Sequence, residues 1–167
     1  SYKHEAQERL IVEELATNLI GVKIASEKIN KLKAKQMPIS NEEVALFKEN
    51  LPFKLTNAQE RTIKEISDDI SLAKPMRRLV QGDVGSGKTV VAAVSMYISA
   101  KNNTQSVLLC PTEVLAEQHF KNFSAWFKNS NIKIELLTGK MPVSKRRGIY
   151  QDLEDGVIDI LIGTHAV

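Results

Sequence analysis

The sequence predicts an α/β fold in which a parallel β-sheet carries helices on both faces and a long helix precedes the sheet. Short apolar runs typical of strands alternate four times with helical patterns after residue 51. One of these runs meets its helix at a glycine-rich turn, whereas the earlier residues show helical periodicity alone. We therefore divide the chain into a helical arm, residues 1–50, and an α/β part, residues 51–167.

The arm begins with one long helix, expected over residues 4–35. Its apolar residues recur every three or four positions, and we expect this stripe to pack against another surface: Ile11, Leu15, Leu19, Val22, Ala25, Ile29 and Leu32. Gly21 interrupts the pattern as a candidate bend, and Pro38 ends the helical segment. The second half is basic, and its lysines form either a solvated face or a track for nucleic-acid phosphates: Lys23, Lys28, Lys31, Lys33 and Lys35. Ser40 and Glu43 then have capping-box spacing, which predicts a second, short helix.

The α/β part is expected to alternate helices and strands in order. Thr56 and Gln59 have capping-box spacing and open its first helix. Helices are expected at 56–72, 87–101, 112–128 and 142–156. Strands are expected at 77–81, 106–111, 132–139 and 157–164. Because ligands of parallel sheets bind at the carboxyl ends of the strands, the turns after these strands are the candidate functional segments.

Composition and charge narrow the classes of protein. Apolar residues make up 43% of the chain, which suffices for a core. No run approaches about 18 consecutive apolar residues, so we expect no membrane span and a cytoplasmic location. The single cysteine, Cys110, excludes an internal disulfide and is expected to be buried. The net charge of +3 permits a nucleic-acid partner without requiring one.

The most specific motif is the run Gly82-Asp83-Val84-Gly85-Ser86-Gly87-Lys88-Thr89, which fits the pattern G-x-x-x-x-G-K-[ST]. Such a loop wraps a polyphosphate with its backbone N–H groups, and its glycines permit positive φ and close approach of phosphate oxygens. The following helix adds the partial positive charge of its N-terminus. Lys88 would bind the β- and γ-phosphates, and the Thr89 hydroxyl would hold Mg²⁺. The alternative is a glycine-rich turn that merely joins a strand to a helix.

Four further segments accompany this loop. They are LPFKLTNAQ (51–59), PTEVLAEQH (111–119), TGK (138–140) and GTHAV (163–167). Together with RRLVQGDVGSGKT they closely resemble the first motor domain of superfamily 2 DNA helicases, and within these the bacterial RecG family. The resemblance covers nearly the whole chain. It implies a RecA-like motor fold, in which the long first helix is similar to the segment that links the RecG wedge domain to the motor.

The resemblance also implies an activity. RecG proteins are ATP-dependent branch-migration helicases that remodel stalled replication forks and Holliday junctions in DNA recombination and repair. It implies ATP and Mg²⁺ as cofactors and branched DNA as the partner. The three histidines show no ligand spacing with one another or with Cys110, so we expect no metal site beyond the nucleotide-bound Mg²⁺. The transcription-repair coupling factor carries a related motor and is one alternative. A non-motor P-loop NTPase is another.

Two residues upstream of the loop resemble the adenine-sensing motif of helicases. Gln59 can offer both an acceptor and a donor to an adenine edge, and Phe53 would stack on the base. The alternatives are that Gln59 only caps a helix and that Phe53 belongs to the core.

The strand-end motifs resemble the family's contacts to the backbone of one DNA strand. Thr112 and the first N–H groups of its helix suit a phosphate, although Thr112 also caps that helix. Gln118 or His119 would add a contact. The same design repeats at the next two strand ends with Thr138, Gly139, Lys140, Thr164 and His165. The basic cluster 144–147 (SKRR) lies near the same edge and is expected to be mostly a solvated helix face.

The family's acidic box, second motor domain and most of the wedge have no counterpart in this sequence. We therefore expect the chain to be a fragment that binds nucleotide weakly but neither hydrolyses ATP robustly nor unwinds DNA alone. The strand expected at 77–81 would lack its later neighbours, and an open sheet edge there would favour self-association.

Overall fold

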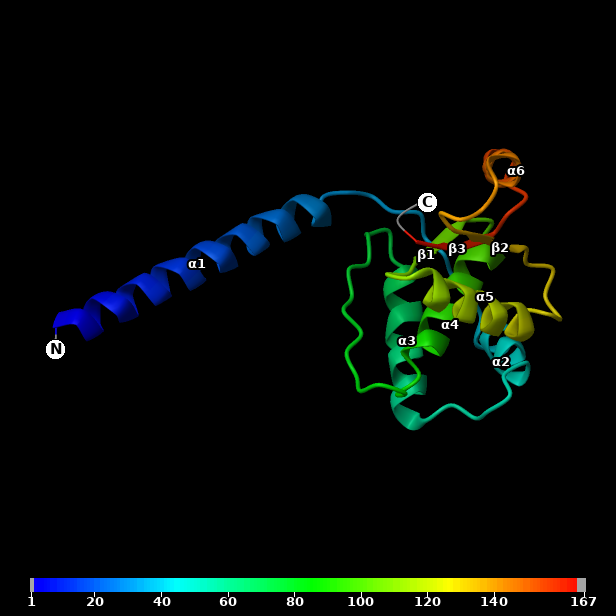
Figure 1. Cartoon of the computed structure of the whole chain (residues 1–167). Helices are drawn as coiled ribbons and strands as arrows, with labels where there is room; N and C mark the ends of the chain where they lie inside the picture. Colours follow the sequence, from blue (N-terminus) through cyan, green and yellow to red (C-terminus); the bar gives the residue numbers. More distant parts are fainter. Residues whose placement is uncertain (1, 165–167) are drawn as a thin grey trace.

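The computed structural model describes residues 2–164, except for the side chains of 2–6, 25 and 28–30. A three-stranded parallel sheet lies between helices on both faces (Figure 1). Its strands are β1 (Ser106–Leu109), β2 (Ile134–Leu137) and β3 (Ile160–Gly163), in the spatial order β1-β3-β2. Leu109 and Leu137 both lie opposite Gly163, so the carboxyl ends of all three strands meet at one edge of the sheet.

The helices other than the first divide between the two faces of the sheet. The chain contains α1 (Tyr2–Asn30), α2 (Asn41–Glu49), α3 (Asn57–Ile70), α4 (Lys88–Lys101), α5 (Glu113–Trp126) and α6 (Val143–Glu154). Ile160 and Ile162 of β3 belong to the large core that α2 to α5 share. Leu161, between them, packs instead with Ile149 of α6. This alternation along one strand confirms the predicted α/β fold with a parallel sheet and helices on both faces.

Side-chain caps set where three helices begin. Ser40 and Glu43 form the expected capping box of α2, with both hydrogen bonds 3.2 Å long. Thr56 and Gln59 form the expected box of α3, with bonds of 2.8 and 3.3 Å. The Thr112 hydroxyl accepts a bond from the Leu115 N–H at the start of α5. Each cap satisfies N–H groups that the helix leaves free, and each stabilises the fold by about 1 kcal/mol.

Aromatic rings tie α2 into the core of the α/β part. The Phe47 ring centroid lies 4.8 Å from those of Tyr97 and Phe127, and the Phe123 and Phe127 rings stack at 5.8 Å. Residues on both sides of the division expected at 50/51 therefore share one core. Cys110 belongs to the same core, so its predicted burial is confirmed.

The strand expected over 77–81 is absent, and that prediction was wrong. This segment has no regular secondary structure, and no strand in the described part of the chain pairs with it. Leu79 is 85% exposed, and Val80 alone of this segment packs on the core. Apolar, β-branched composition does not make a strand without a neighbour to complete its hydrogen-bond ladder. The open edge therefore does not lie at 77–81, since the edge strands of the described sheet are β1 and β2.

Helix α1 projects away from the rest of the molecule in Figure 1. It ends at Asn30, earlier than expected, and continues as a helix through Gly21. The stripe residues Ile11, Leu15 and Leu19 are exposed, and nothing within the described structure packs on them. The expected packing of the stripe is therefore not observed. No helix among residues 2–164 has the length and apolar character needed to cross a membrane.

The linker after α1 is fastened to the carboxyl ends of α3 and α4. The Ala34 N–H donates to the Ala73 carbonyl at 3.1 Å, and the Met37 N–H donates to the Ile70 carbonyl at 3.2 Å. The Lys35 ammonium donates to the Asn102 carbonyl at 2.6 Å, where it also complements the dipole of α4. Lys35, one of the five lysines considered for a phosphate track, thus has a structural role.

Candidate functional site

The phosphate loop owes its shape to glycines with two different functions. Gly85 and Gly87 have φ of +80°, in the left-handed region that residues with a Cβ avoid. A Cβ at Gly87 would also lie 2.1 Å from Gln59 Nε2. Gly82 does not have a positive φ, although a glycine could adopt one. Its lack of a side chain matters for another reason, because a Cβ at this position would lie only 2.8 Å from Ser86 Oγ. Gly82 therefore allows the two ends of the loop to approach each other.

The Lys88 ammonium lies inside the curve of this loop. It donates to the carbonyls of Gly82 and Asp83, both at 2.7 Å, and more weakly to Ser86 Oγ at 3.4 Å. An ammonium has three protons and no acceptor, so these oxygens use its full donor capacity. A phosphate bound by Lys88 would have to take over protons that the loop oxygens now receive.

The start of α4 is suited to an anion. Unlike α2, α3 and α5, this helix begins at a glycine, Gly87, and no side chain caps its first N–H groups. Those N–H groups and the helix dipole favour a negative charge at this position. Thr89 follows in the first turn, and its hydroxyl is the kind of oxygen ligand that Mg²⁺ accepts. The loop and helix start together therefore fit a polyphosphate that carries Mg²⁺.

Gln59 connects the start of α3 to the phosphate loop. Its Oε1 accepts from the Thr56 N–H at 2.8 Å, and its Nε2 donates to the Ser86 carbonyl at 2.9 Å. It also lines a cavity of about 360 Å³ with Val80 and Lys88, between α3 and the loop. Gln59 thus caps its helix and faces the candidate nucleotide cavity at the same time.

Phe53 does not line this cavity. Its ring meets Trp126 edge-on, with centroids 5.9 Å apart and planes at 85°, and it remains 42% exposed. The structure therefore brings Gln59 but not Phe53 beside the phosphate loop. A base held in the cavity would be out of stacking contact with Phe53 in this arrangement.

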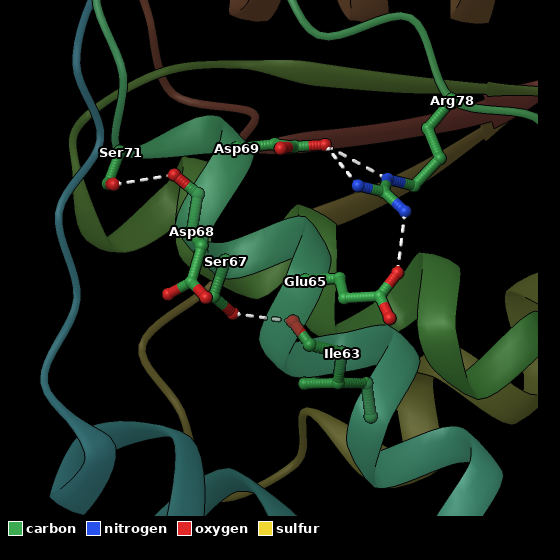
Figure 2. Close-up of polar contacts among 7 residues, drawn as sticks. All are labelled: Ile63, Glu65, Ser67, Asp68, Asp69, Ser71 and Arg78. Atoms are coloured by element: carbon green, nitrogen blue, oxygen red, sulfur yellow. Dashed lines mark hydrogen bonds and ion pairs between the residues drawn. The ribbon is translucent and has the colours of Figure 1, made fainter.

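Arg78 holds the segment that enters the phosphate loop. Figure 2 shows its guanidinium between two carboxylates of α3. Its Nε and Nη2 donate to Asp69 Oδ2 at 2.9 and 2.7 Å, and its Nη1 donates to Glu65 Oε2 at 2.7 Å. The hydrogen bond to Asp69, together with the charges of both carboxylates, raises the pKa of Arg78. These bonds hold the segment 77–81 against α3, although this segment forms no β-ladder with a strand of the described sheet.

Sequence reasoning missed this role of Arg78. The available signal was the pair Glu65 and Asp69, which stand four residues apart and so share one face of the predicted helix. Two carboxylates at that spacing match the fork of an arginine. The spacing of the two carboxylates did not predict which arginine would bind them.

The strand-end residues gather at one edge of the sheet as predicted. Thr112, Thr138 and Thr164 follow β1, β2 and β3, whose last residues are in register. Within the turn after β2, exposure differs between neighbouring residues. Thr138 is only 7% exposed, whereas the side chain of Lys140 is 88% exposed. Thr138 therefore supports the turn from within, and Lys140 presents its charge outward. His165 lies outside the described residues.

The two contacts considered on α5 differ in orientation. Gln118 is exposed. His119 is half-buried, burial lowers the pKa of its imidazole, and its buried Nδ1 has no hydrogen-bond partner among the described residues. A neutral, inward-turned ring is a poor phosphate ligand, so Gln118 is the better placed of the two.

Glu113 and Arg146 hold the TGK turn from two sides, although sequence reasoning gave neither a role. Glu113 Oε2 lies 2.8 Å from the Lys140 ammonium, and Glu113 Oε1 accepts from the Lys140 N–H at 3.3 Å. Arg146 Nη2 donates to the Gly139 carbonyl at 3.0 Å. The hydrogen bond from the Lys140 side chain lowers the pKa of Glu113 below its ordinary value of 4.5, and the same contact raises the pKa of Lys140. Arg146 belongs to the basic cluster expected to be mostly solvated, and it is only partly exposed.

A phosphate loop at the start of a helix, beside a parallel sheet with polar turns at its strand ends, is the arrangement of P-loop nucleotide-binding proteins as a class. The chain belongs to the DEAD/DEAH box helicase family, which it matches over residues 56–167. That range contains Gln59, the phosphate loop and all three strand ends.

Within this class the chain is similar to RecG proteins. It is 42% identical to the ATP-dependent DNA helicase RecG of Aquifex aeolicus over 159 residues, which cover 95% of this chain and 20% of that protein. It is 46% identical to the RecG of Bacillus subtilis over 128 residues, 77% of this chain and 19% of that protein. A solved structure of RecG bound to a three-way DNA junction matches 96% of this chain and 22% of its own chain, with a TM-score of 0.87 and 39% identity. The expected resemblance to RecG is confirmed, and the chain spans about a fifth of the length of these relatives.

Proposed function

We propose that this chain is the nucleotide-binding part of the first motor domain of a RecG-type, ATP-dependent DNA helicase. Residues 1–50 would form the helical arm on the wedge side, and residues 51–167 the N-terminal part of the motor domain. The whole protein would couple ATP hydrolysis to the remodelling of branched DNA, such as forks and Holliday junctions. The relatives named above support this proposal, and one of them was solved on a three-way DNA junction.

The observation that carries the proposal is the geometry around Lys88. Its ammonium is held inside a loop that two glycines with φ of +80° close, at a helix start without a side-chain cap. These features concentrate N–H donors and positive charge at one point, as the binding of a triphosphate requires. A turn that only joined two elements would need neither the lysine nor the uncapped helix.

We assign the nucleotide contacts residue by residue. The backbone of 82–87 and the ammonium of Lys88 would bind the phosphates, and Gln59 would meet the adenine. Thr89 would hold Mg²⁺ through its hydroxyl, and the ion, when bound, neutralises charge on the phosphates. On nucleotide binding, phosphate oxygens would replace the loop carbonyls as hydrogen-bond acceptors of the Lys88 ammonium. Lys88 would then stabilise the negative charge of the phosphoryl group directly.

Two other functions are less well supported. The transcription-repair coupling factor has a related motor, but the relatives reported above are RecG proteins. A non-motor P-loop NTPase would not need the exposed Lys140 and the polar turns that gather at the carboxyl edge of the sheet. This edge is the surface that we propose for the backbone of one DNA strand.

Titration of the chain with a fluorescent ATP analogue, with and without Mg²⁺, tests the nucleotide site. We expect Lys88→Ala to weaken binding at least tenfold, because charge-assisted hydrogen bonds contribute about 1.5–3 kcal/mol. Lys121→Ala, which removes the same charge from an exposed position on α5, is the matched control and should leave the affinity unchanged. Equal affinity of the Lys88 variant and the unaltered chain would refute the proposal. Self-association through a sheet edge and a cytoplasmic location remain predictions.

A further inference from the structure

We propose that Glu113 is a positioning residue for nucleic acid, which joins the turn after β2 to the start of α5 so that both engage one sugar-phosphate backbone as a unit. This inference rests on the proposed function. Glu113 is the first residue of α5 after its cap, Thr112, and follows β1, whereas Lys140 follows β2. Strand β3 lies between those two strands, so the Glu113 side chain connects segments from opposite edges of the sheet.

The contact fixes backbone as well as side chain. One carboxylate oxygen of Glu113 meets the Lys140 ammonium at 2.8 Å, while the other accepts from the Lys140 N–H at 3.3 Å. A Cβ built at Gly139 would lie 3.4 Å from Glu113 Oε1, at ordinary contact distance, so the carboxylate lies close against the turn at this residue as well. A flexible surface ion pair would hold the ammonium alone. Here the turn itself is held.

The opposite side of the turn is held too. Arg146 of α6 donates to the Gly139 carbonyl at 3.0 Å, and the Met141 N–H donates to the Thr138 carbonyl at 3.3 Å. The Thr138 residue is buried beneath them. The turn therefore has little freedom to move once Glu113 is in contact, and Lys140 is placed at a fixed distance from the N–H groups that start α5.

The arrangement leaves Lys140 able to bind a phosphate. The Glu113 side chain is only 23% exposed, whereas that of Lys140 is 88% exposed. The ammonium has three protons, and the contact with Glu113 uses one. A phosphate approaching this edge therefore meets the ammonium rather than the carboxylate. The carboxylate itself is also favoured where it is, beside the N-terminus of α5.

Charge and position predict opposite effects when Glu113 is removed. Loss of a carboxylate makes the surface more positive, and by charge alone it should tighten binding to DNA. Loss of the positioning contact frees the turn and should weaken binding. Glu117 provides the matched control, since it is exposed on the same helix one turn further on. The pKa of Lys140 is raised mainly by Glu113 and in smaller part by the charge of Glu117, yet no hydrogen bond joins Glu117 to the described turn.

The experiment measures binding of a fluorescein-labelled DNA duplex with a single-stranded tail, by fluorescence anisotropy, over a series of salt concentrations. We expect Glu113→Ala to raise the Kd about fivefold and to lower the slope of log Kd against log salt by roughly 0.7–0.9, the loss of one phosphate contact. Lys140→Ala should have the same two effects, and the double variant should bind no more weakly than Lys140→Ala. Glu117→Ala should leave binding unchanged or tighten it.

Several results would overturn the inference. Tighter binding by Glu113→Ala, as for the Glu117 variant, would show that charge alone matters, and additive effects of the Glu113 and Lys140 changes would show that they act separately. If Glu113→Ala does not fold, Glu113→Gln decides, because it keeps an oxygen for the Lys140 N–H and should bind with intermediate affinity. Absence of DNA binding by the unaltered chain would refute the DNA-binding part of the proposed function and this inference with it. Binding by the unaltered chain that Glu113→Ala leaves unchanged would refute this inference alone.

Discussion

Replacement of Gly87 by alanine tests how the phosphate loop is built. Gly85 and Gly87 both have φ of +80°, so an alanine at either position destabilises the fold by about 1–2 kcal/mol. They differ in their surroundings, because a Cβ at Gly85 meets nothing within 4 Å, whereas one at Gly87 lies 2.1 Å from Gln59 Nε2. The backbone effect and any effect on the unfolded chain are similar for the two variants. The difference between them therefore isolates the contact with Gln59.

The magnitude follows from which group can move. Gln59 Nε2 is the end of a flexible side chain, so it would turn away from the new methyl group rather than be compressed. It would then lose its 2.9 Å hydrogen bond to the Ser86 carbonyl, a net loss of about 1 kcal/mol. We thus expect Gly87→Ala to lower the free energy of unfolding by about 1 kcal/mol more than Gly85→Ala does.

Urea unfolding of four proteins completes the test: the unaltered chain, Gly87→Ala, Gln59→Ala and the double variant. Because Gly87→Ala already breaks the bond to Ser86, the Gln59 change should cost about 1 kcal/mol less in its presence. The helix cap that Gln59 also provides is lost equally in both backgrounds and cancels. Gly87→Ala and Gly85→Ala of equal stability, or additive effects within about 0.3 kcal/mol, would refute the reasoning.

Three further predictions concern charged side chains outside the loop. Arg78→Lys keeps the charge but loses the forked contact with Glu65 and Asp69, so it should lower the midpoint of thermal unfolding. The same change at the exposed Arg77 should not lower it. Equal midpoints of the two variants would show that Arg78 does not hold its segment to α3. The lowered pKa of Glu113 means that its contribution to stability is complete above pH 4.5 and is lost as the pH falls through the lowered pKa. The stability difference between the unaltered chain and Glu113→Gln should therefore shrink below pH 4.5, as measured by urea unfolding at each pH. Lys35→Ala should lower the free energy of unfolding by about 1 kcal/mol, and Lys33→Ala should lower it by less than about 0.5 kcal/mol. Equal decreases in the two variants would show that the contact of Lys35 with the carboxyl end of α4 does not stabilise the fold.

Local rules predicted the features that neighbouring residues decide. The capping boxes that begin α2 and α3 need only a hydroxyl and an acidic or amide side chain three residues apart, and both formed as expected. The positive φ at Gly85 and Gly87 likewise follows from the motif itself. Each of these features depends on contacts within a few residues, so the sequence contains the whole interaction.

Features that depend on distant partners were not predicted. The segment 77–81 has the composition of a strand but no ladder partner in the described structure, and composition cannot supply one. Glu113 and Lys140 are 27 residues apart, and they meet only because α5 carries the chain from β1 across the sheet to β2. The same limit applies to the stripe on α1, whose periodicity predicted an apolar face but could not predict what covers it.

The fastened linker makes α1 a lever. A helix of 29 residues is about 43 Å long, so a rotation of about 5° at its base carries its far end through about 4 Å. The linker that follows this base is joined through Ala34, Lys35 and Met37 to the carboxyl ends of α3 and α4. The opposite ends of the same two helices carry Gln59 and the phosphate loop. A rotation of α1 would therefore be transmitted through α3 and α4 to the nucleotide cavity. Conversely, nucleotide binding would change the position of the far end of α1.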